Sequence, residues 1–324
     1  MHQNAQIQLD ITSLQTGSLQ AQILLITLLK PGDLSLSREP EAGNPFFNHI
    51  KPAELETLQL PSQLDLSQGI ILYGNAPIWL YAHLVNQCRQ VPWVASYDIR
   101  QNTAIVVKSS TPLPAVGDKI PMPQRPQPGI AIAIGGPPDS GKSILSNALR
   151  FTLPRHYPNL NLFLHRANWD GEGNWSYETS DRQKVQTLIE RGEYKIHKLP
   201  NANALINSYF DYHAKAIENI RKVVDLAIVD LGGQPEAQKL PVIQQCTHYL
   251  IISSQPAQIP KWHELFGRYL KPLAVLHSKA APDLQRPSHS DFLEQTIDLQ
   301  NLIQTQQIPA ELLRAIAQIL PTTG

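Results

Sequence analysis

The sequence predicts two folded parts, an α+β domain followed by an α/β domain with a mostly parallel sheet. Three observations lead to this prediction. The chain has 324 residues, about the length of two domains. Six prolines fall between Pro112 and Pro128 without apolar periodicity. Strands gather before this stretch, whereas strands and helices alternate after it.

The first half reads as strands with two short helices among them. Residues 5–11 alternate polar and apolar side chains, the period of a half-buried strand, and residues 21–29 read as a more buried strand. Pro52 is suited to begin a short helix over 52–58. The remaining expected elements are a strand at 69–73, a helix at 78–90, and strands at 93–98 and 104–109. This order predicts a helix-backed sheet in an α+β domain over residues 1–111.

The proline-rich stretch predicts a stiff linker over residues 112–128, and the second domain then spans 129–324. Apolar runs predict strands at 130–134, 160–164, 226–230, 249–253 and 273–276. Helices are expected from Lys142, near 181–191, at 203–222 and at the C-terminus. Such alternation is typical of a mostly parallel sheet covered on both faces.

The stretch Gly136–Ser143 has the pattern Gly-x-x-x-x-Gly-Lys-Ser, which is typical of a phosphate-binding P-loop. It lies between a predicted buried strand and a predicted helix, where backbone N–H groups and the helix dipole favour phosphate. We therefore expect ATP to bind here, with Lys142 at the terminal phosphates and the Ser143 hydroxyl on Mg²⁺. The candidate nucleotide-binding residues of this stretch are Gly136, Asp139, Ser140, Gly141, Lys142 and Ser143.

A P-loop domain also needs an acidic residue at the end of an apolar strand to support Mg²⁺. Asp230 ends the apolar run 226–230, so it is the second candidate metal residue beside Ser143. The turn 231–233 that follows is placed to approach a γ-phosphate. Arginines that are candidates for charge stabilisation are Arg150, Arg155, Arg166 and Arg268.

The segment Arg166–Trp175 gathers carboxylates, tryptophans and glycines directly after a predicted strand. Loops at that place lie over the site in open α/β sheets. Asp170 and Glu172 are candidates to orient water or a second metal ion, and Trp169 and Trp175 to stack on a base. An ordered surface loop is the alternative.

Composition excludes some classes of partner. Lys+Arg and Asp+Glu are equal at 27 each, so no net field draws the chain to long nucleic acid or to a membrane. Cys88 and Cys246 fit neither a disulfide framework nor a zinc pattern, and the N-terminus lacks a signal-peptide pattern. We expect a cytoplasmic protein.

Asp98 and Arg100 are the candidate polar pair of the first half. If the strand at 93–98 continues, the two side chains point to the same face. They then suit a phosphodiester site, with the carboxylate on a metal ion and the guanidinium on phosphate. An ion pair at the edge of the sheet is the alternative.

Three segments around these residues form a recognisable pattern. They are Gly74-x-Ala76-Pro77-Ile78-Trp79-Leu80, then Pro92-Trp93-Val94-Ala95-x-Tyr97-Asp98-x-Arg100, and Ala104-Ile105-Val106-Val107-x-Ser109. They resemble the small CRISPR-associated ring nucleases of type III systems over roughly residues 68–120. The whole chain resembles the longer members, in which the nuclease domain is fused to a P-loop domain usually labelled AAA.

The resemblance implies a ferredoxin-like nuclease domain that forms a homodimer or a higher homo-oligomer. It also implies Mn²⁺-assisted cleavage of cyclic tetra-adenylate, the second messenger of type III systems. Asp98 falls on the catalytic and metal-binding Asp of the family, and Arg100 on the arginine that contacts the phosphate ring. Where the family has a helix histidine this chain has Arg89; His83, on the same predicted helix, is the candidate for proton transfer in a different geometry.

Three functions therefore stand open. The first is a ring nuclease whose ATP-binding domain regulates assembly or activity. The second is a cyclic-oligoadenylate sensor without cleavage whose output is the ATPase; the absent family histidine favours it, and the presence of Asp98 and Arg100 opposes it. The third is a nucleotide or small-molecule kinase, which the P-loop and the acidic loop alone support.

Overall fold

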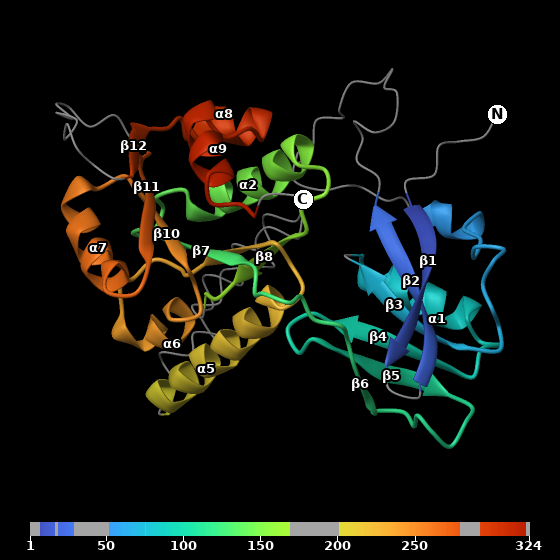
Figure 1. Ribbon diagram of the computed structural model, residues 1–324. Helices are drawn as coiled ribbons and strands as arrows, with labels where there is room; N and C mark the ends of the chain where they lie inside the picture. The colour runs from blue at the N-terminus through green and yellow to red at the C-terminus, as the bar shows by residue number, and fades with distance from the viewer. Residues whose placement is uncertain are drawn as a thin grey trace. The chain divides into compact units, whose positions relative to one another are not determined.

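The computed structural model describes residues 7–16, 19–28, 52–74, 76–168, 201–278 and 292–321. The chain divides into two compact units, Met1–Gln124 and Arg125–Gly324 (Figure 1). No helix among the described residues is both long and apolar enough to cross a membrane.

The first unit is built on a mixed six-stranded sheet whose strands lie side by side in the order of the chain. The strands are β1 (Ile7–Thr16), β2 (Leu19–Leu28), β3 (Gly69–Gly74), β4 (Trp93–Asp98), β5 (Thr103–Ser109) and β6 (Lys119–Pro121). The two pairs β2–β3 and β3–β4 are parallel, and the other neighbours are antiparallel. A 3₁₀ turn η1 (Pro52–Glu56) and the helix α1 (Ile78–Gln87) connect the strands.

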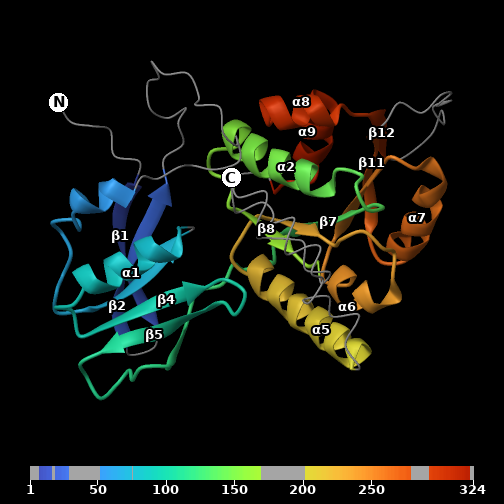
Figure 2. The ribbon, with the colours of Figure 1, turned by 180° about the vertical axis from the view of Figure 1, so that it is seen from behind.

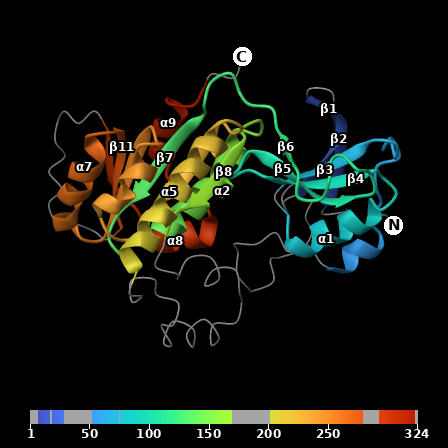
Figure 3. The same cartoon turned by 90° about the horizontal axis from the view of Figure 1, so that it is seen from below.

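Both faces of this sheet bury apolar side chains. Helix α1 covers one face, as Figures 2 and 3 show, and it does so through Leu80 and Leu84, which are fully buried against Ile70 and Leu72 of β3. Leu80 and Leu84 are four residues apart, which places them on one face of the helix. Ile70 and Leu72 are two residues apart, which places them on one face of the strand. Alternate residues of the same strands form a second cluster on the other face. That cluster contains Leu14, Ala21, Ile71, Trp93, Ala95, Ala104, Val106, Ile120 and Met122.

The topology of this unit differs from the ferredoxin-like fold that the resemblance implied. A ferredoxin-like domain is built on split β-α-β units, with another strand between the two parallel ones. Here β3 and β4 flank α1 in sequence and pair directly with each other.

The proline-rich stretch 112–128 also differs from the linker that we expected. It contains β6, which pairs with β5 and buries Ile120, and the buried Met122 follows. The chain divides between Gln124 and Arg125, ahead of the expected start of the second domain at residue 129. Tertiary pairing of a short edge strand accounts for the difference, because prolines are tolerated at such edges.

The second unit is built on a six-stranded sheet in the order β12-β11-β10-β7-β9-β8, and all neighbouring strands are parallel. The strands are β7 (Ile130–Gly135), β8 (Leu162–Arg166), β9 (Leu226–Asp230), β10 (His248–Ser253), β11 (Lys271–His277) and β12 (Leu293–Thr296). The prediction of a mostly parallel sheet is confirmed. Each strand expected in this half is present, and the helix expected near 181–191 lies outside the described residues.

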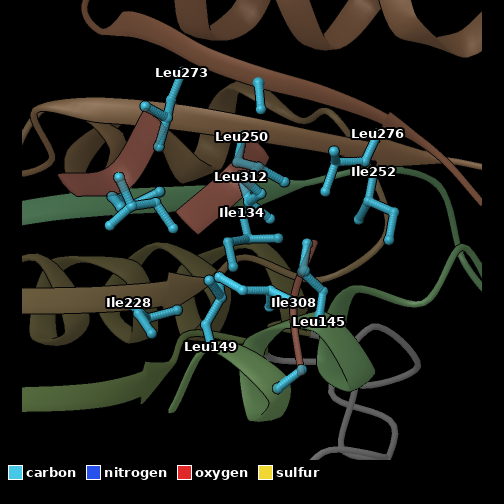
Figure 4. Close-up of a cluster of buried hydrophobic side chains, with 14 of the residues drawn as sticks. Ile134, Leu145, Leu149, Ile228, Leu250, Ile252, Leu273, Leu276, Ile308 and Leu312 are labelled. Carbon is cyan, nitrogen blue, oxygen red and sulfur yellow. The ribbon is translucent and has the colours of Figure 1, made fainter. Parts of the chain in front are cut away.

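Helices lie on both faces of this sheet (Figure 1). One face carries α2 (Lys142–His156), α8 (Leu299–Thr305) and α9 (Ala310–Ala317). The other carries α5 (Ala202–Arg221), the 3₁₀ turns η3 (Ala237–Lys239) and η4 (Pro256–Gln258), α6 (Leu240–Ile243) and α7 (Ile259–Gly267). Figure 4 shows the core between the sheet and the first group, in which Ile134, Leu149 and Leu312 are fully buried. This core fixes α2 against the carboxyl end of β7.

Candidate functional site

The loop between β7 and α2 has a backbone that few side chains allow. Gly135 ends β7, and Lys142 is the first residue of α2. Positive φ angles occur in this loop at Gly136 (149°), Asp139 (57°) and Gly141 (96°). A Cβ at Gly136 would lie 1.8 Å from the carbonyl oxygen of Ile252, so only glycine fits there. The loop ends on the free N–H groups and positive dipole of a helix N-terminus, where anions are favoured.

Ser143 and Asp230 meet at the carboxyl ends of two neighbouring strands. Ser143 Oγ donates a hydrogen bond of 2.9 Å to Asp230 Oδ2, although the residues are 87 positions apart. Strand pairing places them together, since Ile134 of β7 is in register with Asp230 of β9. A hydroxyl and a carboxylate are oxygen ligands of the kind that Mg²⁺ prefers. These residues therefore fit a magnesium ion beside the loop.

Two further loop residues suit phosphate oxygens. The Lys142 side chain is buried at 7% exposure, and its Nζ donates to the Pro137 carbonyl oxygen at 2.7 Å. Its ammonium therefore lies against the loop rather than in solvent. Ser140 is fully buried, and its Oγ has no hydrogen-bond partner in the structure. Because buried hydroxyls are normally paired, this one is suited to donate to a ligand oxygen.

The turn after β9 packs against the P-loop. Gly232 N–H donates to Asp230 Oδ1 at 3.3 Å. Gly232 has a φ of 75°, and a Cβ there would lie 2.6 Å from Asn168 Oδ1. A Cβ at Gly233 would lie 2.9 Å from the Pro138 side chain. The turn is thus held between the end of β8 and the P-loop, close to the place where terminal phosphates would lie.

The remaining candidate residues of the second half differ in their positions relative to the P-loop, and some lie outside the described residues. Asp170 and Glu172 lie outside the described residues, together with the two tryptophans of that loop. Among the four candidate arginines, Arg166 is in register with Asp230 across β8 and β9, so the topology brings it to the same edge of the sheet. Arg268 instead pairs with Glu264 on α7 at 3.2 Å.

In the first unit, Asp98 closes a turn rather than continuing a strand. β4 ends at Asp98, as the sequence predicted, so the strand does not continue and Arg100 does not share a strand face with Asp98. Arg100 N–H donates to Asp98 Oδ1 and Gln101 Nε2 donates to Oδ2, both at 2.9 Å. An aspartate that binds the backbone two residues ahead forms an Asx turn. Lys119 of β6 donates to Gln101 Oε1 at 3.0 Å, which ties the turn to the edge strand.

Asn102, which the sequence reasoning missed, completes this turn. It is 7% exposed with a φ of 48°, a conformation that asparagine tolerates. Its Oδ1 accepts a 2.9 Å hydrogen bond from the hydroxyl of Tyr97, whose ring stacks on Tyr73 at 4.7 Å. Burial raises the pKa of the Tyr97 hydroxyl well above its usual value, so this donor stays protonated. An Asp and an Asn four residues apart between two strands are the signal that could have revealed the turn.

His83 lies on a separate element. It occupies α1, is half-buried, and its Nε2 has no hydrogen-bond partner in the structure. Asp98 and Arg100 thus share one turn, whereas His83 comes from the helix that covers the sheet. No group of three or more metal-ligating side chains occurs among the described residues, so Asp98 is not part of a preformed metal cluster there.

Both cysteines of the chain are buried. Burial raises the pKa of Cys88 to about 11 and that of Cys246 to about 12, so both thiols are protonated at neutral pH. These are the two cysteines of the chain.

Comparison with known proteins gives one family match. Residues 46–121 match the family described as "CRISPR-associated protein (Cas_csx3)". The match includes the turn with Asp98 and Arg100 and ends at the last residue of β6. It supports a CRISPR association for this segment. No curated protein matches the chain significantly.

Solved structures show weak likenesses. A putative plasmid partition protein from Borrelia burgdorferi bound to AMPPNP is 9% identical, with a TM-score of 0.38 over 59% of this chain and 99% of that one. A GTPase from Pyrococcus abyssi is 13% identical, with 0.29 over 60% and 85%. A DUF1611 family protein from Anabaena variabilis is 13% identical, with 0.28 over 81% and 69%. At such scores the fold of the second unit rests on its own topology and its own P-loop.

The packed turn after β9 generates a testable prediction. Gly232→Ala should destabilise the second unit by about 2–4 kcal/mol, from left-handed strain plus the clash with Asn168. Unfolding in urea measures the change. Gly117→Ala is the matched control for strain alone, because Gly117 has a φ of 93° and nothing within 4 Å of its Cβ position.

The double variant Gly232→Ala with Asn168→Ala isolates the contact. It should recover the part of the loss that comes from the clash, which a double-mutant cycle resolves. Strict additivity of the two single changes would contradict the close packing of Gly232 on Asn168.

Proposed function

We propose that the second unit binds and hydrolyses ATP with Mg²⁺, and that it regulates a first unit that cleaves cyclic tetra-adenylate. The hydrogen bond from Ser143 to Asp230 is the observation that supports the nucleotide site most directly. A serine at the end of a P-loop and a carboxylate on the neighbouring strand are the two protein groups that support magnesium in such sites.

In the nucleotide site each residue has a separate task. Backbone N–H groups of the loop 136–141 and the start of α2 hold the phosphates, and Lys142 neutralises the terminal ones. Ser143 and Asp230 would hold the Mg²⁺, which would supply positive charge against the phosphates. In hydrolysis, water attacks the γ-phosphorus, the bond to the β–γ bridging oxygen breaks, and the products are ADP, hydrogen phosphate and a proton that is released to solvent.

In the first unit, the Asp98–Asn102 turn is the proposed ring-binding element. Within the turn, Gln101 donates a hydrogen bond to Asp98, and Lys119 of β6 donates one to Gln101. These bonds pre-organise the turn, which lowers the entropy cost of binding. Arg100 is exposed at this turn and suits a phosphate oxygen. The family match over residues 46–121 supports the CRISPR setting. We assign Asp98 to the reacting phosphate and to Mn²⁺, and His83 to proton transfer from α1.

A homodimer follows from the symmetry of the proposed substrate. Cyclic tetra-adenylate is a two-fold ring with four phosphates, so two copies of the chain would each offer one Arg100 and one Asp98. The 2′-hydroxyl beside each phosphate is a ready internal nucleophile. The protein then mainly positions and neutralises the ring. Free, buried Cys88 and Cys246 fit the reducing cytoplasm in which such a messenger would act.

One observation favours the sensor function as the second candidate. Both carboxylate oxygens of Asp98 already accept hydrogen bonds within its own turn. A carboxylate engaged in this way can serve to shape a binding turn without taking part in cleavage. In that function the ring would remain intact, and the ATPase would be the output.

Substitution of Lys142 tests the nucleotide site. Lys142→Ala should weaken ATP binding by at least about tenfold, because a charge-assisted contact to phosphate contributes roughly 1.5–3 kcal/mol. Calorimetric titration measures the affinity. Lys271→Ala, at an exposed lysine of the same unit, should bind like wild type. Equal affinities for Lys142→Ala and wild type would refute the P-loop assignment.

Substitution of Asp98 separates cleavage from turn formation. Asp98→Asn can keep the Asx turn, because an amide oxygen also accepts from the backbone N–H of residue 100. It removes the charge that the proposed metal-assisted cleavage needs, so ring opening should be lost while ring binding and folding persist. Incubation with cyclic tetra-adenylate and Mn²⁺, with and without ATP, followed by chromatography, measures the linear di-adenylate product.

The matched control is Asp118→Asn. Asp118 Oδ2 accepts from Ala115 N–H at 2.7 Å in another exposed turn of the same unit. This variant should cleave like wild type. Full cleavage by Asp98→Asn would move the chemistry to other residues, and an intact ring that co-elutes with wild type would establish the sensor instead.

A further inference from the structure

Lys239 is a buried lysine that the nucleotide site described above does not use. It ends η3 and is 2% exposed, one of the largest fully buried side chains among the described residues. A buried ammonium is costly unless it is well bonded. Its Nζ donates a hydrogen bond to the Gln234 carbonyl oxygen and lies 5.8 Å from the ring centroid of Trp262. A carbonyl oxygen and the face of an indole ring both stabilise a cation.

The bonded carbonyl belongs to the turn that packs on the P-loop. Gln234 follows Gly233, whose Cβ position is 2.9 Å from the Pro138 side chain. The Gln234 carbonyl also accepts from Glu236 N–H at 3.0 Å. The Gln234 side chain is exposed. Lys239 thus anchors the turn one residue beyond its contact with the P-loop.

A second contact of Lys239, with Trp262, involves the P-loop strand. Trp262 of α7 is fully buried, and a Cβ at Gly135 would lie 2.5 Å from its ring. Gly135 is the last residue of β7, directly before the P-loop. The indole ring therefore contacts both Lys239 and the strand that leads into the loop. The turn, through Lys239, and the last residue of β7, directly, are therefore both packed against one buried side chain.

We propose that Lys239 is a positioning residue for the terminal phosphate. It holds the Gly233–Gln234 turn at a fixed distance from the P-loop, so that the turn's backbone N–H groups and the exposed Gln234 amide face the γ-phosphate and the attacking water. An amide side chain both donates and accepts, which suits a water molecule. The proposal rests on the proposed nucleotide function. It extends that function by giving Lys239 a part in distinguishing ATP, which has a γ-phosphate, from ADP, which has none.

Lys239→Met tests the proposal, since methionine keeps most of the apolar volume and removes the ammonium. The full-length variant should bind ADP like wild type. Its kcat for ATP hydrolysis should fall by about a hundredfold, the cost that a misplacement of 1 Å can carry in an enzyme. The ratio of its affinity for ATPγS to its affinity for ADP should also fall toward one. This ratio can be measured without turnover. Lys261→Met, at an exposed lysine beside Trp262, is the matched control and should behave like wild type.

Each outcome is decisive. Unchanged kcat and unchanged ATPγS preference in Lys239→Met would overturn the proposal, as would an equal loss of ADP and ATPγS affinity, which a purely structural role predicts. If Lys239→Met fails to fold, Trp262→Phe keeps the lysine over a weaker aromatic face and should lower kcat by a larger factor than it lowers ADP affinity; unchanged kcat, or equal losses of the two, would also overturn the proposal. A wild-type protein that binds neither ATP nor ADP would instead refute the nucleotide site itself.

Discussion

The hydrogen bond between Ser143 and Asp230 can form because β7 and β9 are neighbours in a parallel sheet. Parallel strands bring their carboxyl ends to one edge, and the core under α2 holds the start of that helix at the same edge. The glycines at 136 and 141 allow the chain to turn between strand and helix within a few residues. If the two strands were separated, the hydroxyl and the carboxylate could not share a metal ion. The loop would then hold phosphate without its counter-charge.

In the first unit, the candidate site is held by hydrogen bonds between residues that are close in sequence. Two of its candidate residues, Asp98 and Arg100, lie on a turn that Asp98, Gln101 and Asn102 build from their own side chains, and β6 secures that turn from the edge of the sheet. The same carboxylate that the resemblance assigns to catalysis therefore also shapes the backbone. This double use explains why a conservative amide at position 98 is more informative than an alanine. Cleavage and sensing would therefore both use the same turn.

Most features that depend on neighbouring residues were predictable from the sequence, and several that depend on tertiary contacts were not. The strand, loop and helix around Lys142 follow from local apolar periods and the spacing of the motif, and the parallel sheet follows from the alternation of elements. β6 was missed because its three residues lie among prolines and gain their strand conformation only by pairing with β5. The end of β4 at Asp98 was predicted, whereas the Asx turn that begins there was not. The buried Lys239 lies beside Trp262, which is on another element, and no local sequence pattern predicts this contact.

The central claim is that Ser143 and Asp230 hold Mg²⁺ beside a bound nucleotide, and its most direct test is a calorimetric titration of the wild-type protein with ATP. One titration contains Mg²⁺ and the other contains EDTA. The account predicts saturable one-site binding in Mg²⁺ that is at least about tenfold weaker in EDTA, because the chelated sample lacks the charge that offsets the phosphates and Asp230. Equal affinity in the two titrations, or no binding in either, would contradict it.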